Sequence, residues 1–275
     1  MSVFLQLPII NLNDVDETEF RYEGEASGGR GVSRDPSKIL GMQHFGVSLH
    51  TLHPGQENAR YHAERDEEEF FFVQTGSCKV RLDGKIYVLN AGDILHTPVG
   101  CAHSFFNDAE DPCTILMAGQ TVRGTQADYL PAPDGPVETS RPPRCLNVAE
   151  IFPEPVQYDG EVQGSRGESV EVSAALGMKS LFCNIHRLMP GQQDAKFHFH
   201  KQEEEFFMIL KGTPVLCFKD DAQVTQPDDC IYIAPNTPHN FSNRSDKPAI
   251  IFMMNTVCGH PDSFYLPEKR VTRLV

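Results

Sequence analysis

Apolar residues occur along the chain in short runs that turn-forming residues interrupt. In residues 68–76 (EEFFFVQTG) and 78–98 (CKVRLDGKIYVLNAGDILHTP), runs of Val, Ile, Leu, Phe and Tyr alternate with Gly, Asp and Asn. Runs of this length and composition predict β-strands. Residues 82–85 (LDGK) predict a tight hairpin, because Asp-Gly adopts the backbone conformation of a two-residue turn.

Long helices are not predicted anywhere in the chain. Residues 147–155 (NVAEIFPEP) can hold one helical turn before the proline ends it. Many short strands at even spacing are typical of sandwiches and closed barrels. The pattern therefore predicts an all-β fold.

The strand pattern occurs twice along the chain. Residues 60–71 (RYHAERDEEEFF) and 196–207 (KFHFHKQEEEFF) lie 136 residues apart, and the same offset holds over most of the chain. Such a constant register indicates a tandem duplication. The matched pairs include Asn11 and Asn147, Gly41 and Gly177, Pro54 and Pro190, Gly76 and Gly212, His103 and His239, Asn107 and Asn243, and Tyr129 and Tyr265.

Residues 131–143 (PAPDGPVETSRPP) are rich in proline and predict a linker between the two copies. We therefore expect one domain over residues 1–136 and a second over residues 137–275. A chain of 275 residues is long enough for two domains of roughly 100–150 residues.

Charge and composition exclude several partners. The net charge of −14 would repel nucleic-acid phosphates and anionic lipids. An anionic substrate would need a local positive charge, and a bound metal ion is the obvious source. We also expect no membrane span and no secretory signal. The eight cysteines are scattered without a CxxC pair, which favours reduced thiols and a cytoplasmic location.

The second copy carries a set of side chains suited to a metal ion. His198 and His200 are two residues apart, so on a strand both imidazoles face the same side of the sheet. Glu205 and His239 follow on later strands. Three imidazoles and one carboxylate fit a divalent transition metal.

The first copy carries a variant of this set, His62, Glu64, Glu69 and His103. Two hypotheses are open for Glu64. In the first, Glu64 ligates a metal of harder character, such as Mn, Fe or Zn. In the second, Arg60, Arg65 or Arg81 neutralises Glu64 in a metal-free barrel. A site with two carboxylates and a divalent ion is neutral, whereas the second site carries +1 and would favour an anionic substrate.

These residues match the two sequence signatures of the cupin superfamily, so the chain resembles a bicupin of the quercetin dioxygenase-like type. The signature G-x(5,6)-HxH-x(3,4)-E-x(6)-G is met in the second copy, and G-x(5)-PxG-x(2)-H-x(3)-N in the first. The second copy departs from the latter only at turn positions, Asp228, Ala234 and Asn236. The resemblance implies two tandem double-stranded β-helix (jelly-roll) barrels, each with a divalent metal (Fe, Mn, Ni or Zn).

Function is implied by the same resemblance. We expect an enzyme, first of all a dioxygenase acting on a small aromatic or enolisable compound, with dioxygen as co-substrate. Glu205 and Glu69 would exchange protons with a small, possibly anionic substrate, and the protein could form a homodimer. A non-redox lyase, decarboxylase or isomerase is the first alternative. A small-molecule-binding or storage protein is the second.

Several other positions carry weaker expectations. We take Glu203 and Glu204 as ordinary charges at the start of a strand. Phe71, Val73, Phe207 and Ile209 should share the faces of Glu69 and Glu205, either as pocket lining or as plain core. The remaining candidates could contact the site or be buried bystanders: His50 and His186, His96 and Tyr232, and Cys101.

Overall fold

The computed structural model describes residues 9–22, 28–119, 126–151, 166–256 and 263–265. The described residues form two compact units. One, called here the N-terminal barrel, comprises those of Val15–Pro155 with Ala174–Ser180. The other, the C-terminal barrel, comprises those of Met1–Asp14, Val156–Ser173 and Leu181–Val275. Each is an antiparallel jelly-roll barrel, so the expected all-β fold is confirmed.

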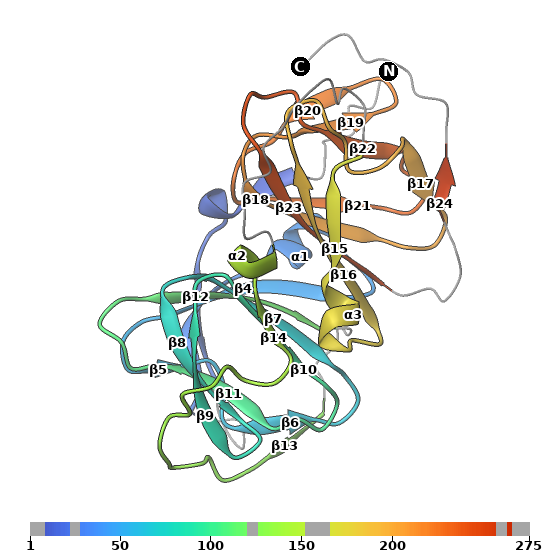
Figure 1. Ribbon diagram of the computed structural model, residues 1–275. Coiled ribbons are helices and arrows are strands. Elements are labelled where there is room, and N and C mark those ends of the chain that lie inside the picture. The colour runs from blue at the N-terminus through green and yellow to red at the C-terminus, as the bar shows by residue number, and fades with distance from the viewer. Residues whose placement is uncertain (1–8, 23–27, 120–125, 152–165, 257–262, 266–275) are drawn as a thin grey trace. The chain divides into compact units, whose positions relative to one another are not determined.

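The N-terminal barrel consists of a seven-stranded and a smaller sheet that face each other (Figure 1). In spatial order, the larger sheet contains β14 (Cys145–Asn147), β10 (Asp93–Thr97), β7 (Glu69–Thr75), β12 (Cys113–Gly119), β4 (Gly46–Leu52), β3 (Arg30–Arg34) and β2 (Thr18–Arg21). The smaller sheet contains β13 (Ala127–Tyr129), β6 (His62–Glu64), β11 (His103–Asn107), β8 (Ser77–Leu82) and β9 (Lys85–Asn90), with β5 (Gln56–Glu57) paired to β11.

The C-terminal barrel repeats this arrangement. Its larger sheet contains, in spatial order, β1 (Ile9–Asn11), β21 (Asp229–Ile233), β18 (Glu205–Lys211), β23 (Ala249–Thr256), β16 (Leu181–Leu188) and β15 (Glu168–Glu171). Its smaller sheet contains β20 (Ala222–Val224), β19 (Val215–Phe218), β22 (His239–Ser242), β17 (His198–His200) and β24 (Ser263–Tyr265).

Helices in the described residues are short. They are the 3-10 turn η1 (Leu12–Asp14), α1 (Pro36–Leu40), α2 (Val148–Ile151) and α3 (Val172–Leu176). Helix α2 lies where the sequence predicts a helical turn. Among the described residues, no helix has the length and apolar character needed to cross a membrane.

The duplication is visible in the strand register. His62 pairs with His103 across β6 and β11, and His198 pairs with His239 across β17 and β22. Both partners of the second pair lie 136 residues after those of the first. The predicted hairpin at Asp83-Gly84 is also present, because Leu82 pairs with Lys85 and both turn residues have positive φ (44° and 82°).

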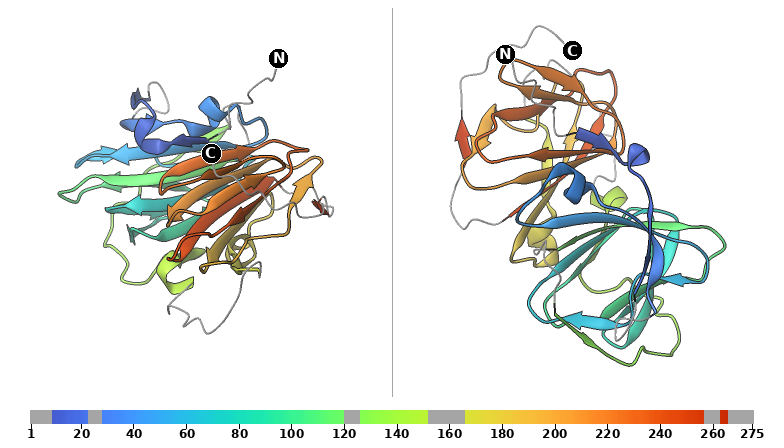
Figure 2. Two further views of the ribbon diagram at one scale, coloured as in Figure 1. Left: turned by 90° about the horizontal axis from the view of Figure 1, so that it is seen from above. Right: turned by 180° about the vertical axis from the view of Figure 1, so that it is seen from behind.

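Each larger sheet contains one strand from the other half of the sequence. Strand β1 pairs with β21 of the C-terminal barrel (Figure 2), and β14 pairs with β10 of the N-terminal barrel. Equivalent asparagines fix both edges, since the amides of Asn11 and Asn147 donate to Asp229 and Asp93 at 2.8 Å each. The expected domain boundary at residue 136 describes the sequence repeat and remains a prediction. In the structure, each of these two short strands pairs with a strand from the other half of the sequence.

The interior of each barrel is a cluster of aliphatic and aromatic side chains. In the N-terminal barrel the cluster includes Leu52, Phe71, Val73, Phe105 and Ile115, all fully buried. Burial of one such side chain stabilises the folded state by about 1.5–3 kcal/mol. The corresponding cluster of the C-terminal barrel contains Leu188, Phe207, Ile209, Phe241 and Ile251. The predicted shared face of Phe71 and Val73, and that of Phe207 and Ile209, is therefore core.

A buried carboxylate ties the segment after α3 to the N-terminal barrel. Glu68 accepts hydrogen bonds from the backbone amides of Lys179 and Ser180, and it lies 3.0 Å from Nε2 of His96. The other ring nitrogen of His96 contacts the carbonyl of Leu176 at 3.1 Å. Burial works against ionisation of Glu68, but these hydrogen bonds prevail and lower its pKa to about 2.

We expect Glu68→Gln to destabilise the N-terminal barrel by about 1.5–3 kcal/mol at pH 7, because the new amide group would face backbone N–H donors. Urea unfolding of the full chain measures this difference. The exposed Glu110→Gln is the matched control and should change the unfolding midpoint little. Equal midpoints for the two variants would contradict this account.

Candidate metal centres

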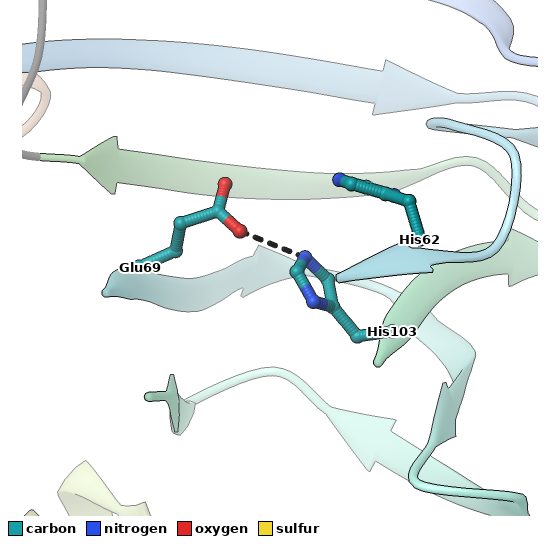
Figure 3. Close-up of side chains that lie close together, drawn as sticks. All are labelled: His62, Glu69 and His103. Atoms are coloured by element: carbon teal, nitrogen blue, oxygen red, sulfur yellow. Dashed lines mark ion pairs between the residues drawn. The ribbon is translucent and has the colours of Figure 1, made fainter. Parts of the chain in front are cut away.

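In the N-terminal barrel, three strands bring imidazole and carboxylate groups together. His62 lies on β6, Glu69 on β7 and His103 on β11, and one ligand atom of each lies within 4.8 Å of the others. Figure 3 shows Glu69 facing His103, with His62 beside them; Nε2 of His103 and Oε2 of Glu69 are 2.9 Å apart. Oε1 of Glu64 lies 3.2 Å from Nε2 of His62, so the fourth expected residue joins the cluster.

The C-terminal barrel assembles the equivalent set. His198 and His200 on β17 and Glu205 on β18 offer ligand atoms within 4.8 Å of one another. Nε2 of His239 on β22 lies 3.1 Å from Oε2 of Glu205, and Nε2 of His200 lies 3.5 Å from Oε1. All four side chains are buried, with relative exposures of 0–9%. Strand alternation places both histidines of β17 on the inner face, as expected.

Backbone carbonyls fix the orientation of four of the five imidazoles. In each, Nδ1 contacts the carbonyl oxygen of the residue two positions earlier, at 2.7–3.0 Å. Because a carbonyl only accepts, Nδ1 is the donor, and Nε2 keeps its lone pair for the cluster. The four are His62, His103, His198 and His239. His200 differs, since its Nδ1 lies 3.0 Å from Oε2 of Glu203.

In each cluster, the carboxylate raises the pKa of the histidine that faces it. Burial lowers the pKa of His239, but the charge of Glu205 and the hydrogen bond to it outweigh burial and raise the pKa overall. The pKa of His103 is raised in the same way, by the charge of Glu69 and the hydrogen bond to it, against the effect of burial. Burial, aided by the charge of His239, lowers the pKa of His198 to about 4, so this imidazole is neutral at pH 7. Neutral imidazole is the form that ligates metal ions.

Glu64 points into its barrel, as the HxH spacing predicts. It is 7% exposed, and its carboxylate lies with those of Glu67 and Glu69 within 4.8 Å. Two of the arginines considered as its partners have other carboxylates. Arg65 pairs with Asp128, and Arg81 pairs with Glu57 at 3.0 Å.

The expectation that Glu203 and Glu204 are ordinary charges at the start of a strand is wrong. Glu67, Glu68 and Glu204 are 6%, 4% and 0% exposed. Glu203 contacts His200 and accepts a hydrogen bond from Asn255 at 2.9 Å, while Glu204 accepts one from the hydroxyl of Tyr232 at 3.0 Å. The sequence did carry one signal of these roles. The glutamates recur at the repeat offset, and so do their polar partners His96 and Tyr232. A run of three charges usually lies in solvent, which concealed it.

The two barrels differ at the level of the candidate ligands Glu69 and Glu205. Glu69 pairs with Gly119, which pairs with Gly46 on the next strand. At the equivalent positions of the C-terminal barrel, Glu205 pairs with Asn255, which pairs with Phe182. Phe182 packs against the core of the C-terminal barrel. In the N-terminal barrel, a Cβ added at Gly119 would lie 3.1 Å from Oε2 of Glu67. Gly46 and Gly119 thus contribute no side chains at this level of the N-terminal barrel, and the carboxylate of Glu67 lies over Gly119.

Three further candidates take structural roles. The thiol of Cys101 lies 3.4 Å from Asp83, and burial together with that carboxylate raises its pKa to about 12, so it is protonated at pH 7. Its carbonyl, rather than its thiol, contacts His103. His96 and Tyr232 contact the buried glutamates described above, not the histidine clusters.

Both donor sets fit a divalent transition metal. The imidazole nitrogens carry available lone pairs, a buried carboxylate faces them, and backbone carbonyls hold the rings in place. The second set is richer in nitrogen. The first set, with Glu64 and Glu69, is richer in oxygen and suits a harder ion. Metal binding by these eight side chains remains a prediction.

Comparisons with known proteins agree with this geometry. The cupin domain family matches residues 48–119 and 184–255, two segments that begin and end 136 residues apart. Among solved structures, the formate complex of Lactobacillus farciminis oxalate decarboxylase has a TM-score of 0.61 at 17% identity, covering 95% of this chain and 88% of that one. A deletion mutant of Bacillus subtilis oxalate decarboxylase OxdC has a TM-score of 0.60 at 16% identity, covering 94% and 79%. Identities this low show the shared fold alone.

A further match is to a curated protein, the uncharacterized HTH-type transcriptional regulator YdiP of Escherichia coli (strain K12). It is 29% identical over 76 residues, which is 26% of this chain and 25% of that protein. The match thus spans about a quarter of the length of this relative. The cupin matches, by contrast, cover more than half of the chain at the repeat offset. The chain belongs to the cupin family, and it carries two cupin domains.

Proposed function

We propose that the protein is a metal-dependent oxidoreductase, a dioxygenase of a small aromatic or enolisable compound, with its main site in the C-terminal barrel. The observation that carries the proposal is the convergence of His198, His200, His239 and Glu205 in a buried cluster. A bound divalent ion would act there as a Lewis acid and, if redox-active, as an electron conduit to dioxygen.

The protein's own groups would hold and orient the reacting molecules. The carbonyls of Lys196 and Thr237 fix the rings of His198 and His239, so Nε2 of each stays directed into the barrel. Glu205 supplies a carboxylate whose pKa is lowered by the charge of the neighbouring imidazoles, in spite of its burial. Its second function would be to accept and return a substrate proton at a carboxylate oxygen.

The surroundings of this cluster favour a largely apolar substrate. Phe207 lies on the strand of Glu205, two residues further along, and its ring packs 5.7 Å from that of His239. Met253 and Ile233 belong to the same apolar cluster. An apolar wall beside a few polar groups is how small-molecule sites are commonly built, and it excludes bulk water from the reacting atoms. The net charge of +1 on a loaded site would favour an enolate or phenolate form.

A non-redox decarboxylase is the second candidate. It is supported by the fold shared with oxalate decarboxylases, among them a Bacillus subtilis enzyme described with Mn(II) centres, with a TM-score of 0.59 at 16% identity. Fold similarity alone does not select a reaction, because one fold hosts many chemistries. The apolar lining is less suited to a small dicarboxylate than to an aromatic ring.

For the N-terminal barrel we propose a second metal, held by His62, Glu64, Glu69 and His103. Its additional carboxylate makes the loaded site neutral, so it would bind an anionic substrate less well than the C-terminal site. Dioxygen as co-substrate, a homodimeric state and a cytoplasmic location remain predictions from the sequence.

The proposal is tested by measuring metal content and gas exchange together. The purified full chain should contain up to two transition-metal ions, and it should consume oxygen with a member of a panel of phenols and keto acids. Carbon dioxide release from dicarboxylates under nitrogen would instead establish the lyase. Stoichiometric metal with neither activity over the whole panel would contradict the dioxygenase proposal and favour a binding protein.

A further inference from the structure

The imidazole of His200 lies between two carboxylates. Its Nδ1 is 3.0 Å from Oε2 of Glu203, and its Nε2 is 3.5 Å from Oε1 of Glu205. The side chains of His200 and Glu203 are only 10% and 12% exposed, so solvent ions screen the contact between them little. Glu203 therefore acts on the ring from the side that faces away from Glu205.

An amide holds the carboxylate of Glu203 in this position. Nδ2 of Asn255 donates a hydrogen bond at 2.9 Å to Oε2 of Glu203, the same oxygen that faces His200. Asn255 lies on β23 directly opposite Glu205 of β18, and it is 6% exposed. The strand that pairs with the strand of Glu205 thus also fixes the carboxylate behind His200.

The position of the ring proton decides whether His200 can bind a metal ion. A neutral imidazole carries one proton, and its other nitrogen has the lone pair that ligates. Glu205 alone would draw the proton to Nε2, where it would block that lone pair. An ionised Glu203 draws the proton to Nδ1 instead, which frees Nε2 and makes it a stronger ligand. At His198 and His239, backbone carbonyls have this role.

The N-terminal barrel replaces both groups that contact this glutamate. At the repeat offset, Glu203 corresponds to Glu67, and its two partners, His200 and Asn255, correspond to Glu64 and Gly119. Glu67 lies over Gly119, and one of its oxygens is within 4.8 Å of carboxylate oxygens of Glu64 and Glu69. The histidine and the asparagine are thus present together in one barrel and absent together in the other.

We propose that Glu203 is a positioning residue of the C-terminal metal site, which holds the ring proton of His200 on Nδ1 so that Nε2 is available as a ligand. Asn255 holds Glu203 in place for this purpose. The inference rests on the proposed function only for the presence of a metal ion in the C-terminal barrel. It requires neither a substrate nor dioxygen.

Two measurements on the full chain test the inference. Competition with a chelator, with zinc alone as the probe, should show that Glu203→Ala weakens binding at the C-terminal site roughly 10–100-fold. Glu203→Gln keeps an acceptor but loses the charge, so its affinity should lie between those of Glu203→Ala and the natural chain. Long-range proton–nitrogen NMR correlations of the metal-free chain give the tautomer of His200, whose signals are identified by their absence in His200→Gln.

The tautomer separates positioning from a structural role. At a pH where the ring is neutral, the natural chain should carry the His200 proton on Nδ1, and Glu203→Ala should move it toward Nε2. Glu204→Ala is the matched control, because Glu204 is equally buried but contacts Tyr232 instead of the cluster. It should leave the tautomer and the zinc affinity of the folded chain unchanged.

A second variant keeps the carboxylate and removes only its support. Asn255→Ala should weaken zinc binding roughly two- to tenfold, the value of one hydrogen bond. Natural zinc affinity in both Glu203→Ala and Asn255→Ala, or a His200 proton on Nε2 in the natural chain, would overturn the inference. A C-terminal site that takes up no metal would overturn it together with the proposed function. Metal binding without oxygen uptake would count against the dioxygenase alone.

Discussion

Replacing His200 with glutamine is expected to remove the metal from the C-terminal barrel and to lower turnover roughly a hundredfold or more. His200 supplies one of three imidazoles, and its Nε2 lies 3.5 Å from Glu205. Loss of a residue that merely supports a ligand already costs about 10–100-fold in metal affinity or activity, and loss of the ligand itself should cost at least as much. Metal content per chain and steady-state turnover measure the two effects.

The control for this variant is His53→Gln, which makes the same substitution at an exposed histidine. It should keep both the metal and the activity. The N-terminal barrel of His200→Gln should also keep its metal, which separates loss of one site from general unfolding. Full activity of His200→Gln would remove the C-terminal cluster from the mechanism.

Replacing Glu64 with glutamine is expected to weaken metal binding in the N-terminal barrel at least tenfold and to leave the C-terminal site occupied. Glu64 is buried beside His62, with 3.2 Å between Oε1 and Nε2, and an amide is a much weaker ligand than a carboxylate. Competition with a chelator, followed by metal analysis, gives the affinity of each site.

Glu64→His provides the matched gain of function. It recreates the HxH pair of the C-terminal barrel and should restore metal binding, with a preference for ions that favour nitrogen ligands. If Glu64→Gln, Glu64→His and the natural chain retain metal equally, Glu64 is not a ligand. The N-terminal barrel would then be a structural partner only.

Much of this architecture could be predicted from the sequence, because its signals are local. The HxH spacing on a strand determines which face both side chains share, and the repeat offset transfers that inference from His198 to His62. The hairpin at Asp83-Gly84 follows from the conformational preference of two residues. The convergence of His239 with Glu205 could be expected only from the family signature, since nothing local relates strands that far apart.

Other features depend on packing between distant strands, so periodicity could not show them. The burial of Glu68 requires the amides of Lys179 and Ser180, which are more than 100 residues away. The contrast between the two sites depends on two glycines, Gly46 and Gly119, which lie beside Glu69 only once their strands have paired.

The exchanged strands set an order in which the protein can be completed on the ribosome. Asn147 bonds to Asp93, 54 residues before it, whereas Asn11 bonds to Asp229, 218 residues after it. At roughly 5–20 residues per second, strand β1 waits about 10–40 s in the nascent chain before its partner is synthesised. Strand β1 therefore finds its place only after its partner strand has been made, and removal of residues 9–11 would damage the C-terminal barrel, whose other strands are all synthesised much later.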